Sequence, residues 1–169
     1  MVGKLINNIK KKINPYKYWK KRGLKTGSGC VIYPSASFGS EPYLVELGDH
    51  VRVTSNVSFV THDGGVWVLR ERESFENIDL FGNIVVGNNV HIGTGATIMP
   101  GVKIGNNCIV GCGAIVTKNI PDNSVAVGVP ARVIETIDEY LSKHKNDFDY
   151  TKNLTGEQKK DYLIKKYEI

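Results

Sequence analysis

Residues 84–119 read IVVGNNVHIGTGATIMPGVKIGNNCIVGCGAIVTKN, and they repeat with a period of six. One column of the repeat is aliphatic throughout: Val86, Ile92, Ile98, Ile104, Val110 and Val116. The residues two places earlier are small or apolar: Ile84, Val90, Ala96, Val102, Cys108 and Ala114. A period of six fits neither an α-helix nor a single strand, so each repeat must combine a short extended run with a turn. Hexapeptide repeats are typical of parallel β-helices, whose coils stack ~4.8 Å apart around an aliphatic interior.

Glycine and asparagine mark the corners of the predicted coils. The glycines that directly follow the aliphatic column are Gly87, Gly93, Gly105 and Gly111. We expect them to adopt backbone conformations that a Cβ atom penalises. Two asparagine pairs, Asn88–Asn89 and Asn106–Asn107, fit the same corners, because asparagine tolerates left-handed geometry better than most residues.

The repeat extends beyond this stretch and divides the chain. It begins at about Leu24, shifts at Glu41-Pro42-Tyr43 and stops between about 61 and 83 before it resumes. The sequence predicts a basic amphipathic helical segment over 1–22, a β-helix over 23–134 and a C-terminal helical tail over 135–169. Residues 61–83 are expected to leave the β-helix as a loop, and such loops often carry function. Residues 155–158 resemble a capping box, and we expect the tail to close one end of the solenoid.

Composition and charge restrict the possible partners. The chain has 169 residues, 41% of them hydrophobic, a formal charge of +5 and a pI near 9.0. No nucleic-acid-binding motif accompanies the basic residues, whereas coenzyme phosphates or an anionic membrane surface fit the charge.

The pattern of residues 2–13 predicts an amphipathic helix that packs on the protein or contacts a membrane weakly. The absence of a signal peptide and the odd number of cysteines, three, indicate a cytoplasmic protein with reduced thiols.

Two segments carry a family resemblance. The segments GNNVHIGTGATIMPGVKIG (87–105) and GCGAIVTKNIPDNSVAVGVPARVI (111–134) resemble the hexapeptide-repeat acyltransferases. The likeness is closest to sugar O-acetyltransferases, such as galactoside and maltose acetyltransferase and the enzymes that acetylate cell-envelope polysaccharides. It covers roughly residues 23–134. The resemblance implies an all-β fold with a left-handed parallel β-helix, a homotrimer, acetyl-CoA as donor, active sites between subunits and no metal.

The resemblance also implies a catalytic residue. Of the four histidines, only His62 lies where the family keeps its catalytic histidine, at the start of the large loop. A histidine there would act as general base on the acceptor hydroxyl and then protonate the coenzyme thiolate, since its pKa suits proton transfer near neutrality. The alternative is an ordinary loop histidine. Asp63 would orient His62, or it would form an Asx turn before Gly64 and Gly65.

Further positions match the coenzyme contacts of the family: Thr94, Cys112, Thr117, Lys118 and Arg132. Backbone amides at the corners would form hydrogen bonds with the pantetheine, and Lys118 and Arg132 would bind the phosphates. The alternative for Lys118 is an ordinary solvated lysine. Glu135 replaces a further family arginine. His91 stands where the family commonly has tryptophan, and it borders the coenzyme groove or is a plain surface histidine.

The acceptor side departs from the galactoside enzymes, because their sugar-binding asparagine has no equivalent near residues 33–36. Tyr43 and Trp67 would stack on a sugar ring, or they would serve in packing. The leading prediction is an O-acetyltransferase that acts on a surface-polysaccharide precursor. Alternatives are an N-acetyltransferase of a nucleotide amino sugar, a serine acetyltransferase, a γ-type zinc carbonic anhydrase that uses His62 and His91, and a non-catalytic scaffold.

Overall fold

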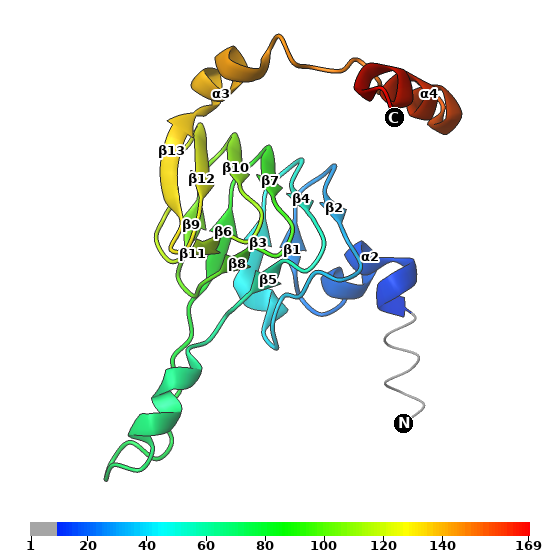
Figure 1. The fold of residues 1–169 in the computed structure, drawn as a ribbon. Helices are drawn as coiled ribbons and strands as arrows, with labels where there is room; N and C mark the ends of the chain where they lie inside the picture. Colours follow the sequence, from blue (N-terminus) through cyan, green and yellow to red (C-terminus); the bar gives the residue numbers. More distant parts are fainter. Residues whose placement is uncertain (1–9) are drawn as a thin grey trace.

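The computed structural model describes residues 10–169, and its centre is a parallel β-helix (Figure 1). Three parallel sheets form the three faces of a prism. The first sheet contains β1 (Lys25–Thr26), β3 (Val45–Leu47), β6 (Ile84–Val86) and β9 (Lys103–Ile104). The second contains β2 (Val31–Ile32), β4 (Arg52–Val53), β7 (Val90–Ile92), β10 (Cys108–Val110) and β12 (Ser124–Val127), edged by the antiparallel β13 (Arg132–Thr136). The third contains β5 (Ser58–Phe59), β8 (Thr97–Ile98) and β11 (Ile115–Val116).

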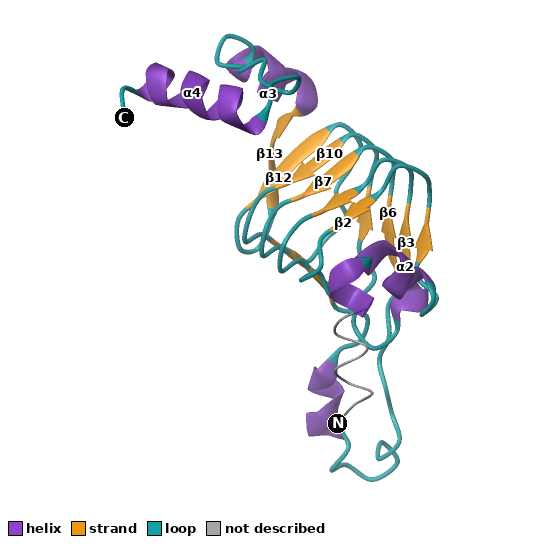
Figure 2. Ribbon diagram, turned by 90° about the vertical axis from the view of Figure 1, so that its right-hand side faces the viewer, coloured by secondary structure: helices purple, strands orange, loops and turns teal. Residues whose placement is uncertain are grey.

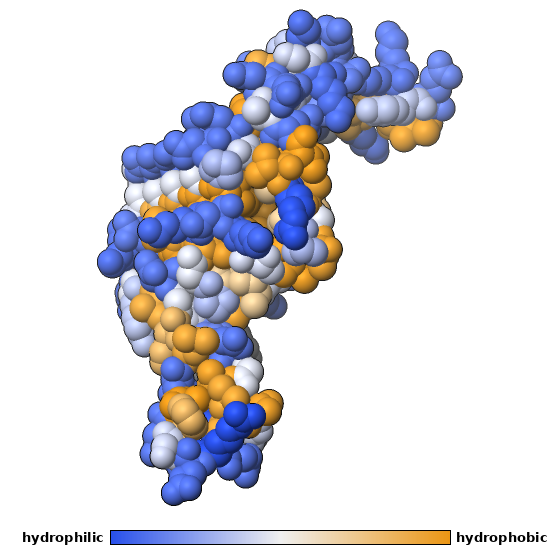
Figure 3. All heavy atoms as spheres, turned by 90° about the vertical axis from the view of Figure 1, so that its left-hand side faces the viewer, coloured by the Kyte–Doolittle hydropathy of each residue, from blue (hydrophilic) through white to orange (hydrophobic). Residues whose placement is uncertain are grey.

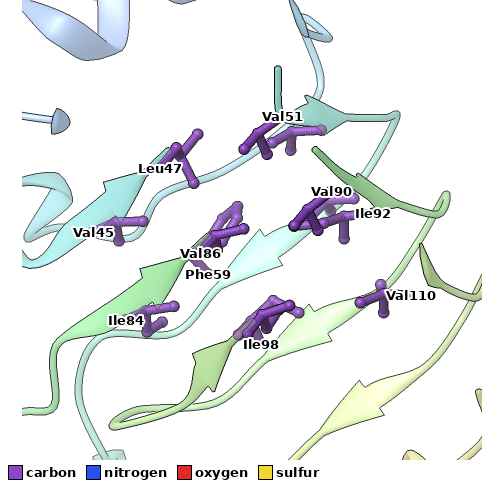
Figure 4. Close-up of a cluster of buried hydrophobic side chains, with 14 of the residues drawn as sticks. Val45, Leu47, Val51, Phe59, Ile84, Val86, Val90, Ile92, Ile98 and Val110 are labelled. Atoms are coloured by element: carbon purple, nitrogen blue, oxygen red, sulfur yellow. The ribbon is translucent and has the colours of Figure 1, made fainter. Parts of the chain in front are cut away.

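The hexad column of the sequence becomes the interior of this prism. Ile92 pairs in register with Val110, and Ile98 pairs with Val116. Both pairs are 18 residues apart, so three consecutive hexads form one coil and occupy the three faces in turn. The column residues are buried, and Figure 4 shows several of them inside the coils. Outside, polar and apolar side chains run in bands along the prism (Figure 3), because each position recurs at the same place in every coil.

The corner glycines have a different role from the one expected. Gly87 and Gly93 do not have positive φ angles; the glycines that do include Gly95 and Gly113. A Cβ atom on Gly93 would lie 2.6 Å from the Cys112 amide nitrogen in the next coil. The glycines after the aliphatic column are therefore required by the close approach of neighbouring coils. The prediction of a strained backbone there was wrong, because coil spacing decides the residue.

Asparagine has two roles at these corners. Asn89 and Asn107 adopt positive φ angles of 55° and 53°, as expected for asparagine, and the Asn89 side-chain amide donates to Asn107 Oδ1 at 2.9 Å. Asn88 has no positive φ angle. Its Oδ1 atom instead accepts a hydrogen bond of 2.7 Å from the Asp49 amide in the neighbouring coil. Such side-chain acceptors satisfy backbone donors where the strands turn.

The N-terminal end of the prism is covered by α2 (Pro15–Lys20), which Asn14 caps by accepting a bond from the Lys17 amide. Trp19 is buried and meets Phe38 edge to face, with the ring centroids 5.2 Å apart. Phe38 in turn stacks on Phe59 at 4.6 Å. This aromatic column joins α2 to the first two coils. The amphipathic helix expected over 2–13 lies mostly in residues 1–9, outside the described residues.

The C-terminal end is closed by a strand. β13 pairs antiparallel with β12 and so covers the edge of the second sheet. α3 (Ile137–His144) follows, beginning two residues later than predicted because Thr136 serves as its N-cap. α4 (Gly156–Tyr167) projects away from the prism (Figures 1 and 2), and the capping box predicted at Thr155 is confirmed.

A segment between β5 and β6 leaves the prism on a narrow neck (Figure 2). The neck is held by the Asp63 amide bonded to the Leu80 carbonyl and by the Gly82 amide bonded to the Thr61 carbonyl. Beyond it lie the 3-10 helix η2 (Gly64–Leu69) and an ion pair between Arg70 and Asp79. Trp67 is 70% exposed, so this aromatic does not pack against the prism.

Two further features concern the helices and the cysteines of the described residues. None of the helices in residues 10–169 combines the length and the apolar character needed to cross a membrane. All three cysteines are unpaired within the described chain: Cys108 is buried, Cys30 is half-buried and Cys112 is exposed. Burial is the main cause that raises the pKa of the Cys108 thiol, so this thiol stays protonated.

Candidate active site

His62 lies at the root of the extruded segment. It follows β5 by three residues and forms an isolated antiparallel bridge with Phe81, whose ring centroid is 6.1 Å from that of the imidazole. The bridge fixes the backbone on both sides of the neck. The His62 side chain is 47% exposed, so the imidazole is accessible at the surface of the chain.

The hydrogen-bonding partner of His62 is Glu41. The Glu41 Oε2 atom lies 3.1 Å from His62 Nδ1 and accepts a second bond, 2.6 Å long, from the Thr61 hydroxyl. Thr61 is fully buried, whereas the Glu41 side chain is 16% exposed. A carboxylate can only accept, so Nδ1 carries the proton and Nε2 is left as the acceptor nitrogen. This tautomer is the one that a general base acting through Nε2 requires.

The surroundings of Glu41 keep it ionised. The Thr61 hydroxyl is the largest cause that lowers the pKa of this carboxyl. Burial comes next and raises the pKa, but the bonds from Ser40 and His62 also lower it, so the net shift is downward. Hydrogen bonds to the charged form favour that form. The Glu41 carboxylate is therefore a fixed negative charge beside the imidazole.

The Asp63 carboxylate has a different partner. It accepts a 2.8 Å bond from the Gly65 amide and forms the Asx turn that was one of the two sequence expectations for this residue. Asp63 also lines a hollow of about 370 Å³ together with Phe81, Met99 and Thr117. The fold thus brings Thr117, a predicted coenzyme contact, close to the neck that carries His62.

The other predicted coenzyme contacts lie toward the C-terminal end of the prism. Thr94 and Cys112 are exposed at the same corner of adjacent coils, where the Gly113 amide donates to the Thr94 carbonyl at 2.8 Å. Lys118 is exposed directly after Thr117. Arg132 is exposed at the start of β13, and its guanidinium donates to the Ala131 carbonyl at 2.8 Å. Glu135 lies 3.9 Å from Lys143, in an ion pair on the same end.

His91 belongs to a different face from His62. It lies in β7 between Arg52 of β4 and Ile109 of β10. Burial, followed by the charge of Arg52, lowers the pKa of His91, so it is neutral at neutral pH. Within residues 10–169 no group of three or more histidine, cysteine, aspartate or glutamate side chains is arranged to hold a metal.

The two predicted sugar-stacking residues are placed differently. Tyr43, 57% exposed in η1 (Pro42–Leu44), is two residues from Glu41. Trp67 lies in η2, beyond the neck.

Glu41 was not predicted from the sequence as a partner of His62, which lies 21 residues later in the chain. The available signal was the shift in the hexad rhythm at Glu41-Pro42-Tyr43, where the chain leaves the regular coil and can present a side chain to the next one.

Known proteins resemble this chain in sequence and in structure. The family model for the bacterial transferase hexapeptide (six repeats) matches residues 83–118. Protein CapG of Staphylococcus aureus is 48% identical over 151 residues, which cover 88% of this chain and 87% of that protein. Galactoside O-acetyltransferase of Escherichia coli K12 is 41% identical over 111 residues, covering 65% of this chain and 52% of that enzyme.

Among solved structures, a galactoside acetyltransferase in complex with coenzyme A superposes with a TM-score of 0.56 and 26% identity. The match covers 88% of this chain and 83% of that one. The repeat, the parallel coils and the extent of these similarities lead to one conclusion. The chain belongs to the hexapeptide-repeat acyltransferases and is an acetyltransferase of that family.

Proposed function

We propose that this protein transfers the acetyl group of acetyl-CoA to a hydroxyl of a sugar, with His62 as general base. The observation that carries the proposal is the Thr61–Glu41–His62 arrangement, in which Glu41 Oε2 lies 3.1 Å from His62 Nδ1. An alcohol is a weak nucleophile until its proton is being removed, and an imidazole held in one tautomer is suited to that task.

The reaction needs no covalent enzyme intermediate. His62 Nε2 takes the proton of the acceptor hydroxyl as its oxygen attacks the thioester carbonyl carbon. Glu41 stabilises the imidazolium that forms, because its carboxylate is already fixed and ionised. His62 then gives the proton to the departing thiolate sulfur as the carbon–sulfur bond breaks. The products are the acetyl ester and the free thiol of coenzyme A.

Two observations support acetyl-CoA as the acetyl donor. The related galactoside acetyltransferase was solved with coenzyme A, and this chain has exposed groups of the right chemistry along one end. Thr94 and Cys112 share one corner, where backbone groups suit the pantetheine amides. Lys118 and Arg132 are cations that would hold the phosphates. Because acetyl-CoA is made and used in the cytoplasm, we place the reaction there.

Three further parts of the proposal rest on the family. We propose that the coils are left-handed, that the enzyme is a homotrimer and that its active sites lie between subunits. We also propose that the acceptor is a precursor of a bacterial surface polysaccharide. The support is the resemblance of residues 23–134 to the enzymes that acetylate cell-envelope polysaccharides. In addition, the sugar-binding asparagine of the galactoside enzymes has no equivalent near residues 33–36.

The deciding experiment is an acetyl-transfer assay with purified protein, acetyl-CoA and a panel of sugars and sugar conjugates. Thiol release is followed with a chromogenic disulfide, and the products are identified by mass spectrometry. The proposal predicts a product 42 mass units heavier, as an ester of a hydroxyl, in the wild type and its loss in His62→Ala. Undiminished transfer by His62→Ala would overturn the assignment of the base, and an amide product would overturn the hydroxyl acceptor.

A further inference from the structure

The N-terminal part of the chain is strongly and uniformly basic. Residues 1–40 contain nine lysines and arginines and no aspartate or glutamate, and Glu41 is the first acidic residue. The rest of the chain has both signs of charge in similar amounts. A segment of one sign attracts anions, and it does so most strongly where the cations converge on a hollow.

Such a hollow is present beside α2. Its volume is about 500 Å³, and four cations line it: Lys10, Lys17, Lys21 and Arg22. Among residues 10–169, none of these four forms an ion pair with a carboxylate. The Arg22 guanidinium lies over the ring of Tyr18, 4.4 Å from its centroid. That stacking orients the guanidinium plane and leaves its N–H donors for an external acceptor.

A second hollow adjoins this cationic hollow and reaches the segment around Glu41. This second hollow, of about 420 Å³, shares Tyr18 and Arg22 with the first and is bounded on its far side by Gly39, Ser40 and Pro42. These last residues flank Glu41, the partner of His62. The residues that follow α2 pack closely against this segment, since a Cβ atom on Gly23 would lie 2.8 Å from Tyr43 Cβ.

Along the axis of the prism, the end of α2 lies close to the coil that carries His62. Trp19 packs on Phe38, which stacks on Phe59, so the end of α2 and the coil that carries His62 are two layers apart. Two coil spacings amount to about 10 Å along the axis of the prism. That distance is comparable to the span of a hexose joined to a phosphate.

Donor phosphates have a separate set of cations in the same protomer. Arg132 starts β13, the strand that covers the C-terminal end of the prism, whereas α2 covers the opposite end (Figure 1). Lys118 follows β11, the last strand of its sheet. The hollow beside α2 is therefore available for a different anion.

We infer that Lys10, Lys17, Lys21 and Arg22 bind the diphosphate of the acceptor, which is therefore a sugar diphosphate conjugate. The inference rests on the proposed function and narrows its substrate class. The diphosphate lies beside α2, and the sugar extends past Gly39 and Ser40 to His62. A nucleoside or a polyprenyl chain is the group attached beyond the diphosphate, and the two sources share this recognition chemistry.

The test is calorimetric binding of two probes, uridine diphosphate and geranyl diphosphate, to full-length protein saturated with coenzyme A. Saturation removes the coenzyme site as a competitor for the diphosphates. The variants are Lys17→Gln/Lys21→Gln and Arg22→Gln. The matched control is Lys12→Gln/Lys20→Gln, which removes the same charge from the same segment but from side chains that do not line the hollow. Circular dichroism melts establish that each variant is folded.

At least one probe is expected to bind to the wild type, and its affinity should fall about 10- to 100-fold in the two hollow variants, as charged hydrogen bonds are lost. The control should change less than about twofold. Preference for uridine diphosphate identifies a nucleotide sugar, and preference for geranyl diphosphate identifies a lipid-linked one. Equal loss in the control, or no binding of either probe, overturns the inference.

A vesicle arm tests the competing use of the same cations. If phosphatidylglycerol vesicles capture the wild type but not Lys17→Gln/Lys21→Gln, while diphosphate binding is unchanged, the hollow is a membrane contact and the inference fails. His62→Ala separates the two proposals, because it should abolish acetyl transfer and keep diphosphate binding. A protein that binds diphosphates yet transfers no acetyl group to any sugar would contradict the proposed function alone.

Discussion

The Glu41 carboxylate holds the imidazole of His62 from a preceding coil, with 3.1 Å between Oε2 and Nδ1. The two residues are 21 positions apart in the chain, and the fold brings them together because the path of the coil shifts at Glu41. The buried Thr61 hydroxyl fixes the same carboxylate oxygen. His62 therefore has a preset tautomer and orientation.

Removal of the imidazole should abolish most of the transfer. For His62→Ala we expect kcat to fall by about 100-fold or more, the usual contribution of a general base, with little change in the KM for acetyl-CoA. The measurement is thiol release under saturating acceptor. The side chain is half-exposed, so the melting temperature should stay close to that of the wild type.

Replacement of Glu41 tests its orienting role. Glu41→Gln can place its amide group against Nδ1 and so favour the wrong tautomer, and we expect a drop in kcat of about tenfold or more. Asp63→Asn is the matched control, because asparagine can also accept from the Gly65 amide and keep the Asx turn. A larger effect of Asp63→Asn than of Glu41→Gln would assign the orienting role to Asp63.

Acid should remove the stabilisation that Glu41 provides. The folded protein lowers the pKa of this carboxyl below its ordinary value of 4.5. Its contribution to the free energy of unfolding is therefore fully present above the ordinary pKa and is lost as the pH falls through the folded pKa. The difference in melting temperature between wild type and Glu41→Gln should be constant near neutrality and shrink below about pH 4.5. A constant difference down to about pH 3 would show that the pKa is not lowered.

The coenzyme contacts should affect binding of the donor more than the chemical step. We expect Lys118→Gln/Arg132→Gln to raise the KM for acetyl-CoA about tenfold or more and to change kcat little, because phosphate contacts lie away from the thioester. Lys103→Gln/Lys152→Gln, at two exposed lysines outside the proposed contacts, serves as the charge control. Equal effects of the two double variants would identify Lys118 as merely a solvated lysine and leave the phosphates with other partners.

Coil spacing predicts which glycines tolerate a side chain. A Cβ atom on Gly87 would lie 2.8 Å from the backbone carbonyl carbon of Gly105, so Gly87→Ala should destabilise the protein by about 1–3 kcal/mol. Gly156 opens α4, has no atom within 4 Å of such a Cβ and should accept alanine without loss. Chemical denaturation of both variants measures the difference. Similar stability of the two would contradict the close approach of the coils.

The sequence by itself determined the parallel β-helix, because the six-residue column from Val86 to Val116 can be buried only when successive coils stack. The capping box at Thr155 was equally readable, since both of its partners lie within four residues. The role of the corner glycines could not be predicted from the sequence. A glycine can be required by a backbone conformation or by the close approach of a neighbouring coil, and the sequence does not distinguish the two. At Gly93 the deciding contact comes from Cys112, 19 residues away.

The candidate site shows the same division. The family pattern predicted His62 as the general base, and adjacency in the sequence suggested Asp63 as its partner. Only the tertiary structure decided that Glu41 contacts the imidazole and that four cations in and around α2 line one hollow. A repeat, a helix cap or a turn depends on residues that are close together in the sequence, so the sequence alone can predict it. A hydrogen bond between coils depends on the number of residues in each coil and on how the coils stack, and only the folded prism fixes both.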